Sequence, residues 1–193
     1  MAAQAQKIVG SDRILKVQTD VGEELLAVAY LRMQQEGLLS MFFWEKAPTL
    51  RAFLDWCAKP ESVVVGVFLE TIAPTLDEPP KVELCGLGCI HSIRSMGGKR
   101  HGDTSEVFFR EFQSIGITGD AGQALLEFAF TKCNMDAIYG VTPSKNLAAV
   151  RFMRWMGFTA FGPIPELCCW NGENCDGWIS VLTRSAWLGR SGK

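Results

Sequence analysis

The stretch that decides the fold runs from residue 119 to residue 158 and reads GDAGQALLEFAFTKCNMDAIYGVTPSKNLAAVRFMRWMGF. Its hydrophobic spacing predicts a helix from Gly119 to Cys133, a strand at 137–141 and a second helix from Pro143 to Met156. Thr142 is a suitable N-cap with Pro143 at the first helical position, and Gly157 suits the left-handed C-terminal cap. The stretch is therefore a helix–strand–helix unit, which requires a sheet to pack on.

The segments outside this unit supply that sheet. The strands expected before it are residues 14–18, 63–69, 82–90 and 105–111, and those expected after it are 164–170 and 178–183. Asp20 can cap a helix that ends near Gly37, and a second helix is predicted at 49–57. Residues 94–104 are polar and glycine-rich and are expected to form a connection, as is the loop around Asn171 to Asn174.

The resulting order of elements is β-α-α-β-β-β-α-β-α-β-β. It predicts an α+β (mixed α/β) fold with a central, mostly antiparallel sheet of six to seven strands and helices on both faces. The sequence shows no internal repeat and no linker, so residues 1–193 are expected to form a single domain, with residues 1–12 flexible.

Composition narrows the class of partner. The chain has 193 residues and a formal net charge of −2, which gives no basic surface for nucleic acid. It has no apolar run long enough for a signal peptide or a membrane span, so no membrane association is expected. The seven cysteines are irregularly spaced and contain no C-x-x-C pair, which predicts reduced core thiols, no metal site and a cytoplasmic protein.

Three separated pieces of sequence carry a family resemblance. They are residues 116–130 (GITGDAGQALLEFAF), residues 138–146 (IYGVTPSKN), and the spacing from Asn146 to Ala149 and on to Gly157-Phe158. Together they resemble the GNAT superfamily of N-acetyltransferases, particularly the branch that includes enzymes acetylating the N-termini of ribosomal proteins. Clear similarity covers about the last 90 residues, and the earlier part agrees in the order of its elements.

The resemblance implies acetyl-CoA as co-substrate and a set of residues that bind it. The loop that would contact the pyrophosphate consists of Ser114, Ile115, Gly116, Ile117, Thr118 and Gly119. A helix N-terminus offers unpaired N–H groups to phosphate, and small residues let the backbone approach it. Asn146 would bind the pantetheine arm. The backbone around Phe108, Phe109 and Arg110 would hold the thioester carbonyl.

The resemblance also implies direct attack of an amine on the thioester. Glu106 stands where related proteins often carry a strand carboxylate and is the first candidate for the general base; Glu111, Glu83 and His91 are weaker candidates. For Glu106, a solvent-facing strand carboxylate is the competing interpretation. Many related proteins have a tyrosine as general acid shortly before the closing Gly-Phe. Here that region reads Phe152-Met153-Arg154-Trp155, so the acid is unassigned.

Two functions are therefore open. The first is an N-acetyltransferase acting on a primary amine, which would be a small molecule, a peptide N-terminus or a lysine. The second is a non-catalytic binding or assembly module with the same fold. The glycines at 116, 119 and 122 also have a purely structural interpretation, as a tight turn into a buried helix. The oligomeric state is open as well, and a homodimer is one arrangement found among related proteins.

Overall fold

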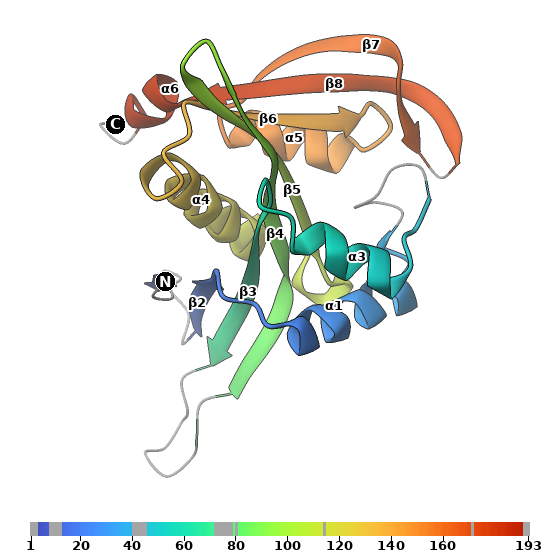
Figure 1. The fold of residues 1–193 in the computed structure, drawn as a ribbon, viewed down its shortest axis with the longest axis vertical. Helices are drawn as coiled ribbons and strands as arrows, with labels where there is room; N and C mark the ends of the chain where they lie inside the picture. The colour runs from blue at the N-terminus through green and yellow to red at the C-terminus, as the bar shows by residue number, and fades with distance from the viewer. Residues whose placement is uncertain are drawn as a thin grey trace.

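The computed structural model describes residues 4–7, 13–39, 46–71, 79, 81–113, 115–170 and 172–190 (Figure 1). They contain one eight-stranded sheet in the order β1-β2-β3-β4-β5-β6-β8-β7. Its strands are β1 (Gln4–Lys7), β2 (Arg13–Gln18), β3 (Val63–Thr71), β4 (Lys81–Met96), β5 (Lys99–Phe108), β6 (Ala137–Pro143), β7 (Thr159–Trp170) and β8 (Glu173–Thr183). The helices are α1 (Glu23–Gln35), α3 (Leu50–Cys57), the 3-10 helix η1 (Arg110–Phe112), α4 (Ile115–Thr131), α5 (Leu147–Trp155) and α6 (Arg184–Leu188).

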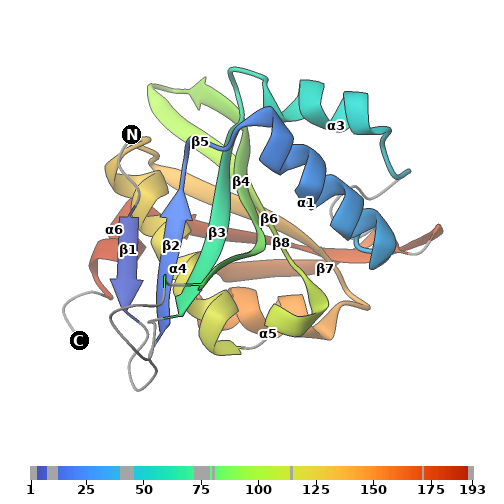
Figure 2. The same ribbon diagram turned by 90° about the horizontal axis from the view of Figure 1, so that it is seen from below.

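Helices cover both faces of the sheet. Figure 2 shows α1 and α3 together on one face, with α4 and α5 on the other. Each face has its own core. Leu26, Met33 and Phe53 belong to the cluster under α1 and α3, and Leu125 and Met153 belong to the cluster under α4 and α5. Every pair of neighbouring described strands is antiparallel except β5 and β6. The mixed α+β class with a mostly antiparallel sheet is confirmed.

The sheet contains one strand more than the sequence predicts. β1 pairs antiparallel with β2, so residues 4–7, which fall in the segment expected to be flexible, add a strand at the edge of the sheet. The expected polar connection at 94–104 is wrong, because β4 runs to Met96 and β5 begins at Lys99. Gly97 and Gly98 have φ values of 59° and 73°, which allow a two-residue turn between twisted strands. β7 and β8 also begin earlier than expected, at Thr159 and Glu173.

Three helix starts differ from the predictions. Gly22, and not Asp20, stands at the N-cap of α1. α4 begins at Ile115, so residues 115–118 form its first turn in place of a loop. α5 is capped by Asn146, whose Oδ1 accepts a hydrogen bond from the N–H of Ala149, while Pro143 ends β6. β6 pairs with β8 as far as Pro143, and this pairing outcompetes the local preference for a helix start.

The C-terminal end of α5 follows the sequence prediction. Gly157 has a φ of 83°, and its N–H and that of Phe158 donate to the carbonyls of Arg154 and Met153. The guanidinium of Arg190 lies against Gly157 and donates to the carbonyls of Trp155 and Met156. The expected left-handed cap at Gly157 is confirmed.

We predict that Gly157→Ala lowers the free energy of unfolding by about 1–2 kcal/mol, because a Cβ disfavours the left-handed conformation and would displace Arg190. Gly189→Ala is the matched control. Gly189 has a φ of −66°, and a Cβ there has only ordinary contacts, the nearest at 3.4 Å. Urea denaturation of the three proteins measures the difference, and equal stability of the two variants would contradict this account of the cap.

Candidate functional site

The candidate site lies where β5 and β6 part. The two strands pair in parallel over three residue positions, the last of which joins Asp103 to Tyr139. Beyond that point β5 continues to Phe108 beside β4, and β6 continues to Pro143 beside β8. Figure 1 shows the two strands diverging. The divergence, called the splay below, leaves residues 104–108 of β5 without a strand partner on one side.

Glu106 lies on β5 within the splay. It is paired with Gly88 of β4, and a Cβ at Gly88 would lie 3.1 Å from Leu125 of α4, so this register position faces α4. Oε1 of Glu106 is 3.4 Å from the position of a Cβ on Gly122 of α4, and the Phe152 ring of α5 is 2.9 Å from the same point. The carboxyl group of Glu106 therefore sits between α4 and α5, on the inner side of both helices.

This position determines the charge of Glu106. The residue as a whole keeps some exposure, but its Oε2 is fully buried and has no hydrogen-bond partner among the described residues. Burial raises the pKa of Glu106 from 4.5 to about 8, since a carboxylate loses its hydration there and gains no hydrogen bond. Glu106 is consequently protonated for most of the time at neutral pH. A solvent-facing carboxylate, the competing interpretation from sequence, is not what the structure shows.

The α4 side of the splay is otherwise apolar. The Met153 methyl of α5 packs against Gly140 of β6, and the Thr104 methyl of β5 is 3.8 Å from the position of a Cβ there. Thr104 Oγ1 is buried without a hydrogen-bond partner among the described residues. Two buried polar atoms, Thr104 Oγ1 and Glu106 Oε2, thus belong to side chains on the same face of β5.

The glycines of the expected loop have different surroundings. A Cβ on Gly119 would lie 2.8 Å from the Trp155 ring, and one on Gly122 would meet Phe152, so these two glycines let α5 approach α4. A Cβ on Gly116 would meet nothing within 4 Å. Packing therefore explains Gly119 and Gly122, and only Gly116 presents open backbone, in the exposed first turn of α4.

The structure describes most, but not all, of the other residues expected to bind acetyl-CoA. Ser114 lies outside the described residues. Ile115 begins the helix, and Thr118 is half-buried in its first turn. Ile117 packs against the core under α1 and α3. Asn146 uses its Oδ1 to cap α5, while its side-chain nitrogen makes no hydrogen bond to a described residue.

The backbone expected to bind the thioester already makes hydrogen bonds within the protein. The N–H of Phe109 donates to the Cys85 carbonyl at 2.9 Å, and the N–H of Arg110 donates to Glu36 Oε2 at 2.7 Å. The Arg110 guanidinium also donates to the Glu36 carbonyl, and the Phe108 carbonyl accepts from Gln113 Nε2. The Arg110 contacts join the segment after β5 to the C-terminal end of α1, and two of the three expected amides, those of Phe109 and Arg110, are engaged.

The structure does not bring Glu111 into the splay. It lies on η1 with an exposed side chain that pairs with Arg32 of α1, with 2.6 Å between Oε1 and Nη2. Arg32 also lies over the Phe109 ring, 4.2 Å from its centroid. Glu83, near the far end of β4, pairs with Lys81. Neither carboxylate has a contact with Glu106 among the described residues.

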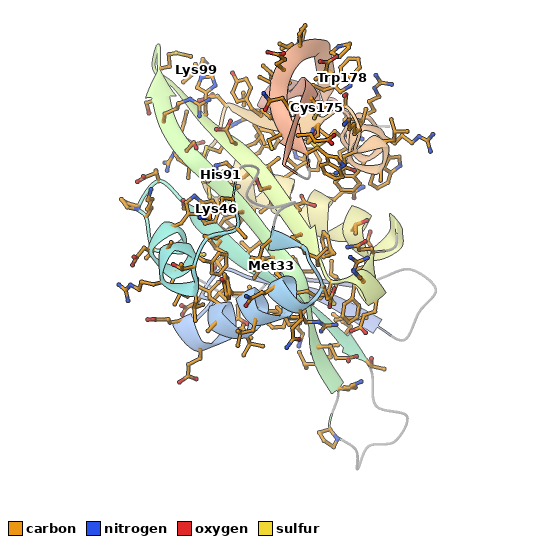
Figure 3. All side chains as sticks on the ribbon, turned by 90° about the vertical axis from the view of Figure 1, so that its right-hand side faces the viewer. Met33, Lys46, His91, Lys99, Cys175 and Trp178 are labelled. Atoms are coloured by element: carbon orange, nitrogen blue, oxygen red, sulfur yellow. The ribbon has the colours of Figure 1, made fainter. Side chains whose placement is uncertain are left out.

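A polar pair lies on the opposite face of β5. His91 of β4 contacts Ser105 of β5, with 2.9 Å between Nε2 and Oγ, and its Nδ1 is 3.1 Å from Ser92 Oγ. The Trp56 ring of α3 lies 5.5 Å from the imidazole centroid. Figure 3 shows His91 on the sheet, seen from the side of α1 and α3. Burial lowers the pKa of His91, and Arg94 adds to this effect while Asp103 opposes it. Sequence reasoning found His91 but missed Ser105.

Two hollows lie on this same side of the protein. One of about 260 Å³ is lined by residues of α1 and α3, including Glu23, Arg51 and Asp55. The other, of about 360 Å³, is lined by Tyr30, Gln34 and the segment around Pro48. Neither includes a residue of the splay. Among the described residues, no cluster of three or more His, Cys, Asp or Glu side chains is arranged to hold a metal ion.

Comparison with known proteins identifies the fold. No protein-family model matches the sequence, and no curated protein was found to match it. Spermidine N-acetyltransferase SpeG from Vibrio cholerae, in complex with CoA and spermine, matches with a TM-score of 0.71 at 17% identity, over 90% of this chain and 98% of that chain. Mutant forms of the same enzyme match with a TM-score of 0.69 at 18% identity, over 92% and 99%.

A third structure, described as a probable acetyltransferase, matches with a TM-score of 0.69 at 16% identity, over 95% of this chain and 99% of that chain. At these identities the likeness shows the fold alone, which is GNAT-like. The parallel pair that splays within a mostly antiparallel sheet is part of that likeness. No described helix combines the length and the hydropathy that crossing a membrane would require.

We predict that stability depends on pH through Glu106. Between pH 4.5 and about pH 8 the folded protein holds a proton that the unfolded chain has lost. The free energy of unfolding of the wild type should therefore fall as pH rises through this window, by at most about 1.4 kcal/mol per unit. Glu106→Gln should remove that component. Urea denaturation at stepped pH measures it, with Glu127→Gln, on the exposed face of α4, as the control that should retain the wild-type slope.

Proposed function

We propose that this protein is an acetyl-CoA-dependent N-acetyltransferase that transfers the acetyl group to a primary amine by direct attack. The observation that carries the proposal is the splay of β5 and β6 with Glu106 inside it. Strand edges that lack a partner in a sheet interior leave polar groups to be satisfied by something other than the chain. On the face of β5 that meets α4 and α5, the side-chain atoms Thr104 Oγ1 and Glu106 Oε2 are also buried without a hydrogen-bond partner among the described residues.

The residues near the splay fit an elongated, amide-rich and phosphorylated ligand. α4 begins close to the end of β5 and spans 17 residues, so its N-terminus is the positive end of a helix dipole. Gly116, open and exposed in its first turn, would let a pyrophosphate approach the backbone. Asn146 has a free donor for a pantetheine amide. Acetyl-CoA would supply the activated acetyl group; the chain's residues would bind it, exclude water and move protons.

The acceptor is a finer part of the proposal. The similarity of residues 116–158 to enzymes that acetylate ribosomal-protein N-termini favours a peptide N-terminus. The spermine in the complex of the Vibrio cholerae enzyme favours a polyamine. The hollow between α1 and α3 carries Glu23 and Asp55 against one Arg51, which pairs with Asp55, so it has a slight excess of negative charge suited to a cationic amine. Measuring the rate of CoA thiol release with spermidine, with a peptide and with free lysine would show which of the three acceptors the protein prefers.

A non-catalytic module remains the second candidate, and a specific observation favours it. The amides of Phe109 and Arg110 are engaged, and α5 packs closely on α4 through Trp155 and Phe152. A protein that had lost catalysis would tolerate such contacts. Calorimetric titration with acetyl-CoA followed by thiol release with amines separates the two functions, because a module of this kind would release no CoA with any acceptor.

We predict that Gly116→Glu weakens acetyl-CoA binding at least about tenfold, since a carboxylate at the first turn of α4 would repel the pyrophosphate. The variant should fold normally, because the position is exposed and open. Gln35→Glu adds the same charge at an exposed position of α1 and is the control. Isothermal titration calorimetry measures the affinities. An unchanged affinity for Gly116→Glu would remove α4 from the binding site.

A further inference from the structure

Two polar groups lie on opposite faces of β5. Glu106 and Ser105 are neighbours in the chain, and successive side chains of a strand point to opposite faces. Glu106 faces α4 and α5, while Ser105 faces α1 and α3, where it contacts His91. Both lie just beyond Asp103, the last residue of β5 that pairs with β6.

The first group is an acid in an apolar enclosure. The carboxyl of Glu106 lies beside Gly122 and Phe152, with the Met156 methyl 3.2 Å from the same Cβ position on Gly122. No charged side chain from α4, α5 or β4 acts on it among the described residues, and burial alone raises its pKa. A carboxylic acid that holds its proton at pH 7 can donate that proton to a leaving group.

The second group is a base with an intermediate hydroxyl. If Nδ1 of His91 donates its hydrogen to Ser92 Oγ, then Nε2 is the acceptor and the Ser105 hydroxyl donates to it. Arg94 and Asp103, the charged groups near the imidazole, pair with each other at 3.1 Å. Burial keeps His91 neutral at pH 7, so its ring is ready to receive a proton.

We propose that Glu106 is the general acid for the CoA leaving group and that Ser105 contacts the acceptor amine and passes its proton to His91. The assignment rests on the proposed acetyltransferase function. It places the acid on the face of α4, where the cofactor would bind, and the base on the face covered by α1 and α3, the side of the protein that carries the two hollows. His91 acts through Ser105 and is a positioning residue in this scheme.

The step balances in atoms and charge. The amine nitrogen attacks the thioester carbonyl carbon, so a C–N bond forms and the C–S bond breaks. The amine proton moves to Ser105 Oγ as the serine hydroxyl proton moves to His91 Nε2. The sulfur takes the Glu106 proton. The products are the N-acetylated amine and CoA thiol, and the carboxylate and imidazolium that remain return to their starting states by proton exchange with water. A thiol has an unperturbed pKa of about 8.5, so its proton affinity is close to that of Glu106.

The test is the pH dependence of kcat/KM with an amine whose own pKa lies below the measured range. The kcat/KM of the wild type should rise as the pH passes the pKa of His91 and fall above the pKa of Glu106. Glu106→Gln should lower the rate at pH 7 at least about tenfold and abolish the alkaline fall. If Glu106 were the base, the rate would instead rise through its pKa, and Glu106→Gln would abolish that rise. That result would overturn the assignment and leave the acetyltransferase function intact.

The base is tested with matched variants. His91→Gln and Ser105→Ala should each remove the acid-side rise, and the double variant should be no slower than the slower single one, because the two residues act in series. His101→Gln changes the chain's only other histidine, and Ser95→Ala changes an exposed serine of β4; both should retain the wild-type profile. An unchanged profile in His91→Gln would remove His91 from the scheme.

A measurement on the protein without substrate completes the test. Nitrogen-15 NMR should show a neutral His91 with its hydrogen on Nδ1 at pH 7, and Ser105→Ala should shift the Nε2 resonance. Infrared titration should show a protonated carboxyl that is absent in Glu106→Gln. A charged Glu106 or the other imidazole tautomer at pH 7 would overturn the assignment. A wild type that passes both spectroscopic tests but acetylates no amine would overturn the proposed function instead.

Discussion

The structure depends on one constraint, which is that β5 and β6 share hydrogen bonds for three positions and then separate. Each strand keeps a partner on its other side, β4 for β5 and β8 for β6, so the sheet remains intact although β5 and β6 stop pairing. Side chains of α5 occupy the α4 face of the gap, with Met153 against Gly140. Because these side chains are apolar, they offer no hydrogen-bond partner to the polar side chains of β5 that point to this face. Unpaired buried polar atoms are costly, and Thr104 and Glu106 both carry one here.

The close approach of α5 to α4 is the second consequence. Gly119 and Gly122 are the positions at which Trp155 and Phe152 come within contact of the α4 backbone. A Cβ at either position would push the helices apart and open the enclosure around Glu106. Glycine is therefore required within residues 116–122 for two different physical reasons. Two of the glycines allow packing, and Gly116 alone keeps backbone open at the helix start.

The sequence predicted the parts of the fold that local patterns determine. Hydrophobic spacing located α4, β6 and α5, and the left-handed cap at Gly157 followed from its position. The errors lie where distant pairing decides the outcome. Pro143 is held in β6 by β8, and residues 99–104 form a strand because the Gly97-Gly98 turn folds them back on β4. Glu106 was found through family resemblance, but its burial depends on α5, some 40 residues further along the chain. The contact between His91 and Ser105 was not predictable, since it requires the register of two strands.

The two faces of β5 impose opposite conditions on protonation. Next to α4 and α5, a carboxyl meets methyl and aromatic groups, so its neutral form is favoured and it retains a proton. Next to α3, burial also favours the neutral form, but for an imidazole the neutral form is the one that accepts a proton. The same physical effect, loss of hydration, therefore keeps the proton on the carboxyl group on one side of the strand and leaves the imidazole without one on the other. No charged partner is needed for either group. An amine and a thioester that met at the edge of β5 would find the proton acceptor on the side of the amine and the proton donor on the side of the sulfur.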